Sequence, residues 1–303
     1  MSKTVWMFPG QGAQKAGMAK DFYEKSAAAR AVFDEAAEAL DFDLKTLCFT
    51  ENEDLHQTEY TQPCLVAACL AMASELRSRG YRPDLTAGLS LGEYAAIAAA
   101  GGMSARDAVR LVRKRGLLMA HTVPAGEGSM CAVLGMETEA VEQVLAGLEG
   151  VTIANYNCPG QLVVTGRTGS VREASEALKA AGARRVVPLK VSGPFHSPLL
   201  KSAGEELAEE LSKVEFHELE VPYYANVTAE RVTDSDKIRP LLARGVSSSV
   251  RWQQSVEAML ADGADTFVEI GPGRTLAGFL KKINPDVRVY NISSLEDMEG
   301  IAQ

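Results

Sequence analysis

The chain has 303 residues, of which 46% are hydrophobic and 23% are charged, and its formal net charge is -9. This length and composition are enough to bury a full core, so they indicate a globular protein and exclude a disordered one. The acidic balance argues against nucleic acid as a partner, because binding a polyanion requires a concentrated basic surface. The apolar runs are too short to cross a membrane, and the N-terminus lacks the pattern of a cleavable signal. We therefore expect a cytoplasmic protein that contacts no membrane.

The cysteines and histidines carry no metal-binding pattern. The five cysteines include no C-x-x-C pair, and the four histidines are not spaced with them as ligands of one ion would be. This usage is typical of a reducing compartment rather than of a disulfide scaffold. We expect no metal and no cofactor, with a monomer as the default oligomeric state.

Strand-like and helical segments alternate along most of the chain. The segments with a strand pattern are residues 4–8, 85–87 and 266–270, and those with a helical pattern are residues 61–79, 105–122 and 274–282. This alternation predicts an α/β protein with a mainly parallel sheet. We expect a large core similar to that of the α/β-hydrolases.

The rhythm of the predicted elements changes in the middle of the chain. The order there is strand 129–134, helix 138–148, strand 151–156, strand 161–165, helix 170–181 and strand 184–190. This β-α-β-β-α-β order is that of a ferredoxin-like unit. We predict a small subdomain of residues 124–192 inserted into a large α/β domain of residues 1–123 and 193–303. The cleft between the two is the natural place for a ligand.

Ser90 is the centre of a G-x-S-x-G run at residues 88–92, between a short strand signal and an alanine-rich helical signal. This is the sequence form of a nucleophile elbow, in which flanking glycines let the backbone turn sharply from strand into helix. The serine hydroxyl is then presented at a helix N-terminus, where amide groups favour a developing negative charge. An ordinary tight turn is the alternative, because the short pattern also occurs by chance.

His196 is the histidine best placed to serve as the base for Ser90. Ser197 and Pro198 have the pattern of a helix N-cap and first helical residue, which puts His196 on the loop at the mouth of a helix. An imidazole that titrates near neutrality can take a proton and return it to a leaving group. A solvated loop residue or a capping partner is the alternative.

Arg115 falls on the apolar stripe of the helix predicted to begin after Ser104, whereas Arg113 and Lys114 fall off that stripe. A guanidinium that points inward must find an anion or bear a large desolvation cost. Two interpretations remain open. The arginine forms a structural ion pair with an internal carboxylate, or it binds the carboxylate of a substrate through two parallel hydrogen bonds.

Seven short motifs occur in one order along the chain. They are Phe8-Pro9-Gly10-Gln11-Gly12-Ala13-Gln14, Thr61-Gln62-Pro63, Gly88-Leu89-Ser90-Leu91-Gly92-Glu93-Tyr94, Arg115-Gly116, Asn157-Cys158-Pro159-Gly160-Gln161, Gly193-Pro194-Phe195-His196-Ser197 and Glu269-Ile270-Gly271-Pro272-Gly273. Each is weak alone, but together the series resembles that of the malonyl-CoA:acyl carrier protein transacylases. The resemblance covers nearly the whole chain.

The resemblance implies a ping-pong acyl transfer with malonyl-CoA and acyl carrier protein as partners. Ser90 would attack the malonyl thioester with His196 as its base, and the malonyl-serine ester would then pass to the phosphopantetheine thiol of the carrier protein. The backbone N–H groups of Leu91 and Gln11 would hold the oxyanion. The chain length is closer to the fatty-acid synthesis enzyme than to an excised polyketide synthase module, although the sequence leaves the identity of the carrier protein open.

The resemblance also implies substrate contacts. Arg115 matches the arginine that pairs with the malonyl carboxylate, and Gln62 and Asn157 match positions that line the site. Satisfaction of local backbone groups is an equally good account of those two amides. Phe195 is bulky where a branched acyl α-carbon would need room, which favours malonyl over methylmalonyl.

The sequence departs from the family pattern at two positions. Leu89 stands where the family often has a histidine, so any contact of that imidazole is absent. Gly245 falls where the family commonly has a glutamine whose main-chain carbonyl orients the catalytic histidine. Glycine can still supply that carbonyl, but its looser backbone puts the alignment of the hydrogen bond in doubt.

The rival enzyme class is a serine esterase or thioesterase, which uses the same elbow with an acid and a histidine that follow the serine. A carbonyl behind His196 stabilises imidazolium less well than a carboxylate would, which favours transfer over hydrolysis. A general esterase also has no need for a buried cation such as Arg115. A non-catalytic interaction module is disfavoured because Ser90, His196, Arg115 and both oxyanion-hole positions, Gln11 and Leu91, are all present.

Overall fold

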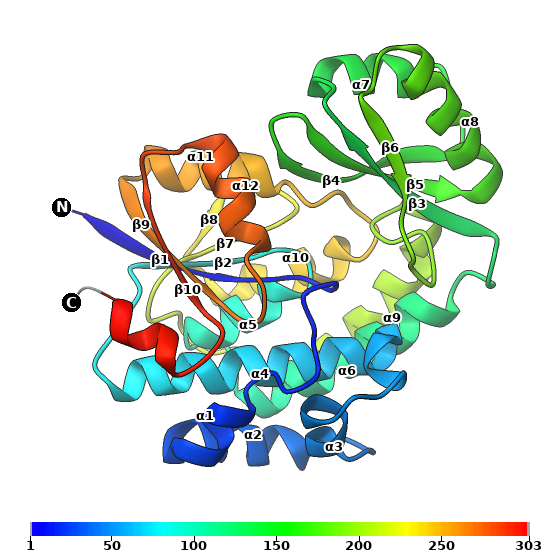
Figure 1. Cartoon of the computed structure of the whole chain (residues 1–303). Helices are drawn as coiled ribbons and strands as arrows, with labels where there is room; N and C mark the ends of the chain where they lie inside the picture. The colour runs from blue at the N-terminus through cyan, green and yellow to red at the C-terminus, as the bar shows by residue number, and fades with distance from the viewer. Residues whose placement is uncertain (1, 302–303) are drawn as a thin grey trace.

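The computed structural model describes residues 2–301, and its larger sheet, sheet A, has six strands in the order β10-β9-β1-β2-β7-β8 (Figure 1). The strands are β1 (Lys3–Phe8), β2 (Leu85–Gly88), β7 (Tyr223–Tyr224), β8 (Arg231–Val232), β9 (Ala264–Ile270) and β10 (Arg288–Ile292). All neighbouring pairs run parallel except β7 with β8. The predicted α/β core with a mainly parallel sheet is confirmed.

Helices cover both faces of sheet A. The helices of this part are α1 (Lys20–Lys25), α2 (Ala27–Ala37), α3 (Leu44–Phe49), α4 (Thr58–Ser78), α5 (Gly92–Ala99), α6 (Ala105–His121), α9 (Lys201–Leu211), α10 (Ile238–Gly245), α11 (Trp252–Ala261) and α12 (Thr275–Ile283). Short 3-10 turns occur at η1 (Asp54–His56), η2 (Pro198–Leu200), η3 (Ser235–Lys237) and η4 (Glu296–Gly300). Figure 1 shows α4 and α6 on one side of the sheet and α11 and α12 on the other.

The alternation of side chains along β1 explains these two layers. Trp6 and Phe8 belong to the core cluster that contains α4, α5 and α6, whereas Val5 and Met7 belong to the cluster that contains α11 and α12. Successive residues of a strand point to opposite faces, so the four consecutive apolar residues Val5 to Phe8 are buried on both sides of the sheet. No helix within residues 2–301 combines the length and the hydropathy that a membrane span needs.

A second sheet, sheet B, is antiparallel and has the order β4-β5-β3-β6. Its elements are β3 (Gly128–Leu134), α7 (Thr138–Leu145), β4 (Val151–Cys158), β5 (Gln161–Arg167), α8 (Thr168–Ala180) and β6 (Arg185–Pro188). The predicted β-α-β-β-α-β order is confirmed. The limits of 124 and 192 for an independent subdomain stay a prediction.

Two elements of sheet B are shorter than the sequence pattern indicates. Strand β6 ends at Pro188 rather than at residue 190, although the Leu189 N–H still donates to the Met130 carbonyl of β3 at 3.0 Å. Helix α7 ends at Leu145 rather than at residue 148, just before Gly147, whose flexible backbone disfavours helix.

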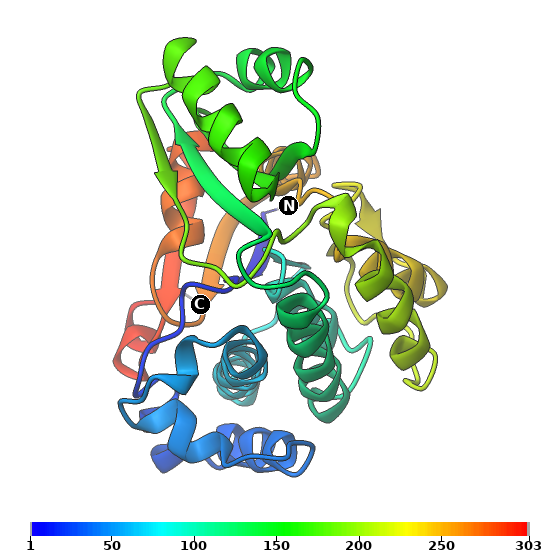
Figure 2. The ribbon, with the colours of Figure 1, turned by 90° about the vertical axis from the view of Figure 1, so that its right-hand side faces the viewer.

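The two faces of sheet B have different neighbours. One face packs on α7 and α8, which Figure 2 shows together on one side of the green strands. Met130, Ala154 and Val163 on the other face belong to the core cluster of sheet A. The backbone also joins the two parts, because the Val250 N–H donates to the Ala154 carbonyl at 2.8 Å and the Val250 carbonyl accepts from the Tyr156 N–H at 2.9 Å. This face of sheet B is therefore held against the carboxyl ends of the sheet A strands.

Candidate active site

Ser90 lies at the sharp turn between β2 and α5, at the carboxyl end of β2. Its φ of 53° is in the left-handed region, which is rare for a residue other than glycine. A Cβ at Gly88 would lie 2.0 Å from the Gly92 backbone, and a Cβ at Gly92 would lie 2.1 Å from the Phe8 carbonyl. No side chain fits at either position, so both glycines of the G-x-S-x-G run are sterically required for this turn.

His196 contacts the serine directly. The Ser90 Oγ lies 2.7 Å from His196 Nε2, and His196 Nδ1 lies 2.9 Å from the Gly245 carbonyl and 3.2 Å from the Ser248 carbonyl. A carbonyl can only accept, so Nδ1 carries the proton and Nε2 is left to accept from the serine hydroxyl. The hydrogen bond to the Gly245 carbonyl is the one whose alignment the sequence left in doubt. Ser248 supplies a second carbonyl that sequence reasoning missed.

The environment of His196 keeps its imidazole neutral. The side chain is buried, and burial together with the positive charge of Arg115 lowers its pKa to about 4, against the opposite pull of the Gly245 and Ser248 carbonyls. At neutral pH the imidazole is therefore free to accept the proton of Ser90.

A pH profile tests this lowered pKa. The rate at which a fluorophosphonate probe modifies Ser90 is expected to stay level as the pH falls through 6.5, and to drop only as the pH approaches the His196 pKa of about 4. The lowered pKa also makes the free energy of unfolding fall as the pH falls below about 6.5. The unfolded histidine binds a proton below its ordinary pKa of about 6.5, whereas the folded one does not. This group therefore destabilises the fold progressively from pH 6.5 down to its folded pKa. A half-maximal labelling rate near pH 6.5 would contradict the burial argument.

Arg115 is buried on α6, as the helical pattern predicted, with only 3% of its surface exposed. Its Nη1 donates to Gln62 Oε1 at 2.8 Å, its Nη2 donates to Ser90 Oγ at 3.0 Å, and its guanidinium carbon lies 5.6 Å from the centre of the Tyr94 ring. Arg113 pairs with a carboxylate, whereas Arg115 forms no ion pair within residues 2–301. The structural ion pair that the sequence left open is therefore not formed within residues 2–301. Burial lowers the pKa of Arg115. The guanidinium is nevertheless a buried cation that has no ion-pair partner among the described residues.

A cavity of about 210 Å³ opens beside Ser90, between the carboxyl ends of the sheet A strands and sheet B. Besides Ser90, its lining includes four predicted residues, Gln11, Asn157, Phe195 and His196, together with Asn155. Asn157 is buried, and its Oδ1 has no hydrogen-bond partner within residues 2–301. An unpaired buried amide oxygen that lines a cavity can accept from a ligand.

The loop that carries Gln11 lies against the elbow. A Cβ at Gly10 would lie 2.7 Å from the Leu89 carbonyl, and the Gln11 side chain is held by a hydrogen bond of 3.0 Å to Thr58. Within residues 2–301 the backbone N–H groups of Gln11 and Leu91 make no hydrogen bond. Leu91 follows the serine directly and Gln11 lines the same cavity as the serine, so both free amides belong to the site.

Gln62 differs from Gln11 and Asn157 in its position. It is buried on α4 and does not line the cavity. Its side-chain oxygen accepts from Arg115, and its side-chain nitrogen donates to the Met119 sulfur at 3.7 Å. Its contact with a ligand would therefore pass through Arg115.

Asn226 is the functional residue that sequence reasoning missed most clearly. Its Oδ1 accepts from the Ser90 N–H at 2.6 Å, and its Nδ2 donates to the Gly88 carbonyl at 2.7 Å. No motif marks this residue, because an asparagine after a two-residue strand is equally typical of a turn. Glu93, in the elbow motif itself, is buried and accepts from the Asn226 N–H at 3.2 Å. Burial raises its pKa to about 8, although the Asn226 N–H and Arg115 oppose that shift.

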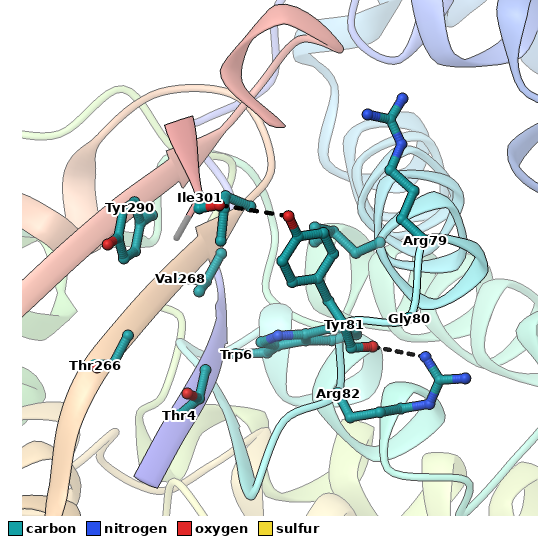
Figure 3. Close-up of a pocket in the computed structure, with 11 residues that line it drawn as sticks. Thr4, Trp6, Arg79, Gly80, Tyr81, Arg82, Thr266, Val268, Tyr290 and Ile301 are labelled. Atoms are coloured by element: carbon teal, nitrogen blue, oxygen red, sulfur yellow. Dashed lines mark hydrogen bonds between the residues drawn. The ribbon is translucent and has the colours of Figure 1, made fainter. Parts of the chain in front are cut away.

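A separate cavity of about 450 Å³ lies near the amino ends of β1 and β9, whereas Ser90 follows the carboxyl end of β2 (Figure 3). Trp6, Tyr81 and Val268 are among its lining residues, and the Tyr81 hydroxyl donates to the Ile301 carbonyl at 3.4 Å. None of the predicted site residues lies there. The candidate site is therefore the cavity beside Ser90.

Comparison with known proteins places this chain in one family. The family described as acyl transferase domain matches residues 5–292. A malonyl CoA-acyl carrier protein transacylase of Bacillus subtilis is 45% identical over 304 residues, which cover 99% of this chain and 96% of that protein. A crystal structure of an acyl carrier protein S-malonyltransferase from Vibrio cholerae has a TM-score of 0.96 at 39% identity, covering 99% of this chain and 100% of the other. A malonyl-transacylase in complex with its type II PKS acyl-carrier protein has a TM-score of 0.93 at 37% identity and 98% coverage of both chains. With this identity over nearly its whole length, the chain belongs to the acyl transferase family of the malonyl CoA-acyl carrier protein transacylases.

Proposed function

We propose that this protein transfers the malonyl group of malonyl-CoA to the phosphopantetheine thiol of acyl carrier protein, through a malonyl ester of Ser90. The observation that carries the proposal is that the Ser90 hydroxyl contacts a neutral histidine and a buried, unpaired arginine together. A serine with a base explains acyl transfer in general, and the cation beside it explains an acyl group that ends in a carboxylate.

In the first half-reaction His196 Nε2 takes the proton of Ser90 as Oγ attacks the thioester carbonyl carbon. Negative charge then develops on the carbonyl oxygen, and the free amides of Gln11 and Leu91 are the donors available to stabilise it. Collapse of the intermediate breaks the C–S bond, and the imidazolium returns its proton to the departing CoA thiolate. The second half-reaction runs these steps in reverse, with the phosphopantetheine thiol as the nucleophile.

Arg115 provides the selectivity in this proposal. Gln62 holds one nitrogen of the guanidinium at 2.8 Å, which leaves the side that faces Ser90 to form two parallel hydrogen bonds with the malonyl carboxylate. The arginine would exchange its contact with the serine hydroxyl for one with the substrate. Substrate binding would thereby satisfy a cation that is otherwise buried without a counter-charge.

The cavity beside Ser90 suits the arm that delivers the acyl group. The unpaired Oδ1 of Asn157 can accept from an amide N–H of the pantetheine chain, which both CoA and the carrier protein have. Phe195 fills the wall next to His196, where a methyl branch on the acyl α-carbon would need room. This arrangement supports malonyl as the preferred group over methylmalonyl.

Two observations favour transfer over the rival esterase activity. His196 Nδ1 donates to carbonyls rather than to a carboxylate, so the imidazolium is stabilised only weakly for activating water. Arg115 would form no charge-assisted pair with a neutral ester, which carries no carboxylate. The carrier-protein partner is supported by the structural relative that is itself a complex with an acyl-carrier protein. We propose a cytoplasmic monomer, with a fatty-acid or a polyketide carrier protein as the acceptor.

The test is the intact mass of the protein after brief mixing with malonyl-CoA, followed by addition of acyl carrier protein that bears phosphopantetheine. The transferase should gain one malonyl group and then lose it to the carrier protein, whose mass rises by the same amount. A hydrolase would accumulate little adduct and release free malonate. Release of malonate without gain of mass on the carrier protein would overturn the proposal.

A further inference from the structure

The elbow needs a contact that holds it in its strained form. Ser90 has a positive φ, which an ordinary side chain adopts only when the surrounding structure enforces it. The hydrogen bonds of the elbow to itself, such as Glu93 N–H to the Ser90 carbonyl at 3.2 Å, are those of the first turn of a helix. On the strand side of the serine, the Gly92 N–H donates to the Leu89 carbonyl and the Leu89 N–H donates to the Phe8 carbonyl, each at 3.0 Å. Neither bond holds the Ser90 N–H or the Gly88 carbonyl, the other halves of the same two peptide groups.

Asn226 bonds to those peptide groups. Strand β7 pairs with β2 through Thr86 with Tyr223 and Ala87 with Tyr224, and both strands then leave the ladder. Beyond that point the Asn226 side chain takes over, because its amide offers one acceptor and one donor like a peptide group. It binds the Ser90 N–H at 2.6 Å and the Gly88 carbonyl at 2.7 Å, on both sides of Leu89. The side chain thus extends the sheet pairing by one step at the place where β2 becomes the elbow.

The backbone of Asn226 is itself fixed from two directions. Its N–H donates to Oε1 of the buried Glu93 side chain at 3.2 Å, and its carbonyl accepts from the Arg251 N–H at 2.8 Å. Asn226 is only 3% exposed and does not line the cavity of about 210 Å³ beside Ser90. It borders, with Ser90 and Arg115, only a void of about 10 Å³, which is too small for an acyl arm. Its action on the reaction must therefore pass through Ser90 and not through the acyl arm.

We propose that Asn226 is a positioning residue for the nucleophile, and that Glu93 positions Asn226. By holding the peptide groups on both sides of Leu89, the asparagine keeps Ser90 Oγ at 2.7 Å from His196 and keeps the Leu91 N–H turned toward the reacting carbonyl. The inference rests on the proposed acyl transfer for its substrate, but the geometry that it concerns is that of the serine alone.

The first test compares Asn226→Ala with a matched control, Asn52→Ala. The Asn52 amide also bonds three backbone groups, the Leu47 and Thr50 carbonyls at 3.0 and 2.8 Å and the Leu55 N–H at 2.8 Å, but it lies outside the site. Asn226→Ala should slow both kcat and fluorophosphonate labelling of Ser90 by about 10- to 100-fold, the usual effect of a misplaced reacting group. The KM for malonyl-CoA should stay within about twofold, because the binding contacts are untouched. Asn52→Ala should match the parent in labelling rate and kcat.

The second test uses Glu93, so that the proposal stays testable if Asn226→Ala folds poorly. Glu93→Gln keeps an oxygen that can accept from the Asn226 N–H and should retain most of the labelling rate. Glu93→Ala removes that acceptor and should lower the labelling rate in the same direction as Asn226→Ala. Equal labelling rates for Glu93→Ala and Glu93→Gln would overturn the role of Glu93, and a parental labelling rate in a folded Asn226→Ala would overturn that of Asn226.

The probe separates this inference from the proposed function. Fluorophosphonate labelling requires the serine, its base and the oxyanion donors, but neither malonyl-CoA nor carrier protein. A parent that labels rapidly yet does not transfer malonyl would end the proposed function and leave the role of Asn226 standing. An unchanged labelling rate in Asn226→Ala, with malonyl transfer intact in the parent, would end this inference alone.

Discussion

Replacement of Ser90 by alanine is expected to abolish the malonyl adduct and to lower transfer to carrier protein by about 10⁴-fold or more, the usual loss when a serine nucleophile is removed. The variant should remain folded, because alanine is no larger than serine at this turn. Its free energy of unfolding should fall by about 1 to 3 kcal/mol, since the Arg115 Nη2 loses the acceptor that it has at 3.0 Å. The measurements are intact mass after mixing with malonyl-CoA and thermal unfolding.

A serine outside the site gives the control for this variant. Ser175 on α8 donates to the Val171 carbonyl within its own helix, and Ser175→Ala should acquire the adduct at the parental rate. Appearance of the malonyl adduct in Ser90→Ala would move the nucleophile to another residue and remove the basis for the whole site.

Arg115→Ala is expected to reduce malonyl transfer by about 10- to 100-fold, because a charge-assisted pair of hydrogen bonds is worth about 1.5 to 3 kcal/mol. Acetyl transfer should hold or improve, since acetyl-CoA has no carboxylate to pair with the arginine. The loss of the contact between Nη2 and Ser90 Oγ also frees the nucleophile. The measurement is the ratio of malonyl to acetyl loading onto carrier protein in the parent and the variant.

Arg115→Lys distinguishes the two properties that the arginine combines. Lysine keeps the positive charge but lacks the planar fork, so it cannot hold Gln62 and a carboxylate together in the same geometry. We expect an intermediate ratio of malonyl to acetyl loading. If malonyl and acetyl transfer fall by the same factor in both variants, together with a loss of thermal stability, Arg115 serves the core and not the substrate.

The sequence was most informative where the deciding interactions are local. The elbow was predictable because its two glycines and Ser90 lie within five residues, and a close approach of backbone to backbone excludes any larger residue there. The burial of Arg115 followed from helical periodicity, and sheet B followed from the alternation of strand and helix patterns. The motif series then indicated Gln11, Gln62 and Asn157, which no local pattern would have separated from ordinary polar residues.

By itself, then, the sequence determined the elements of sheet B, the central strands and main helices of the sheet A part, and the chemistry available at Ser90, His196 and Arg115. Only the tertiary structure decided what surrounds them. Asn226 contacts Ser90 across 136 residues of sequence, and Ser248 contacts His196 across 52, so no local signal marks either. The lowered pKa of His196 likewise depends on burial and on the nearby Arg115, and the cavity exists only because sheet B packs against the carboxyl ends of sheet A. Such contacts arise from the packing of elements remote in sequence, whereas propensity and periodicity report only on neighbours along the chain.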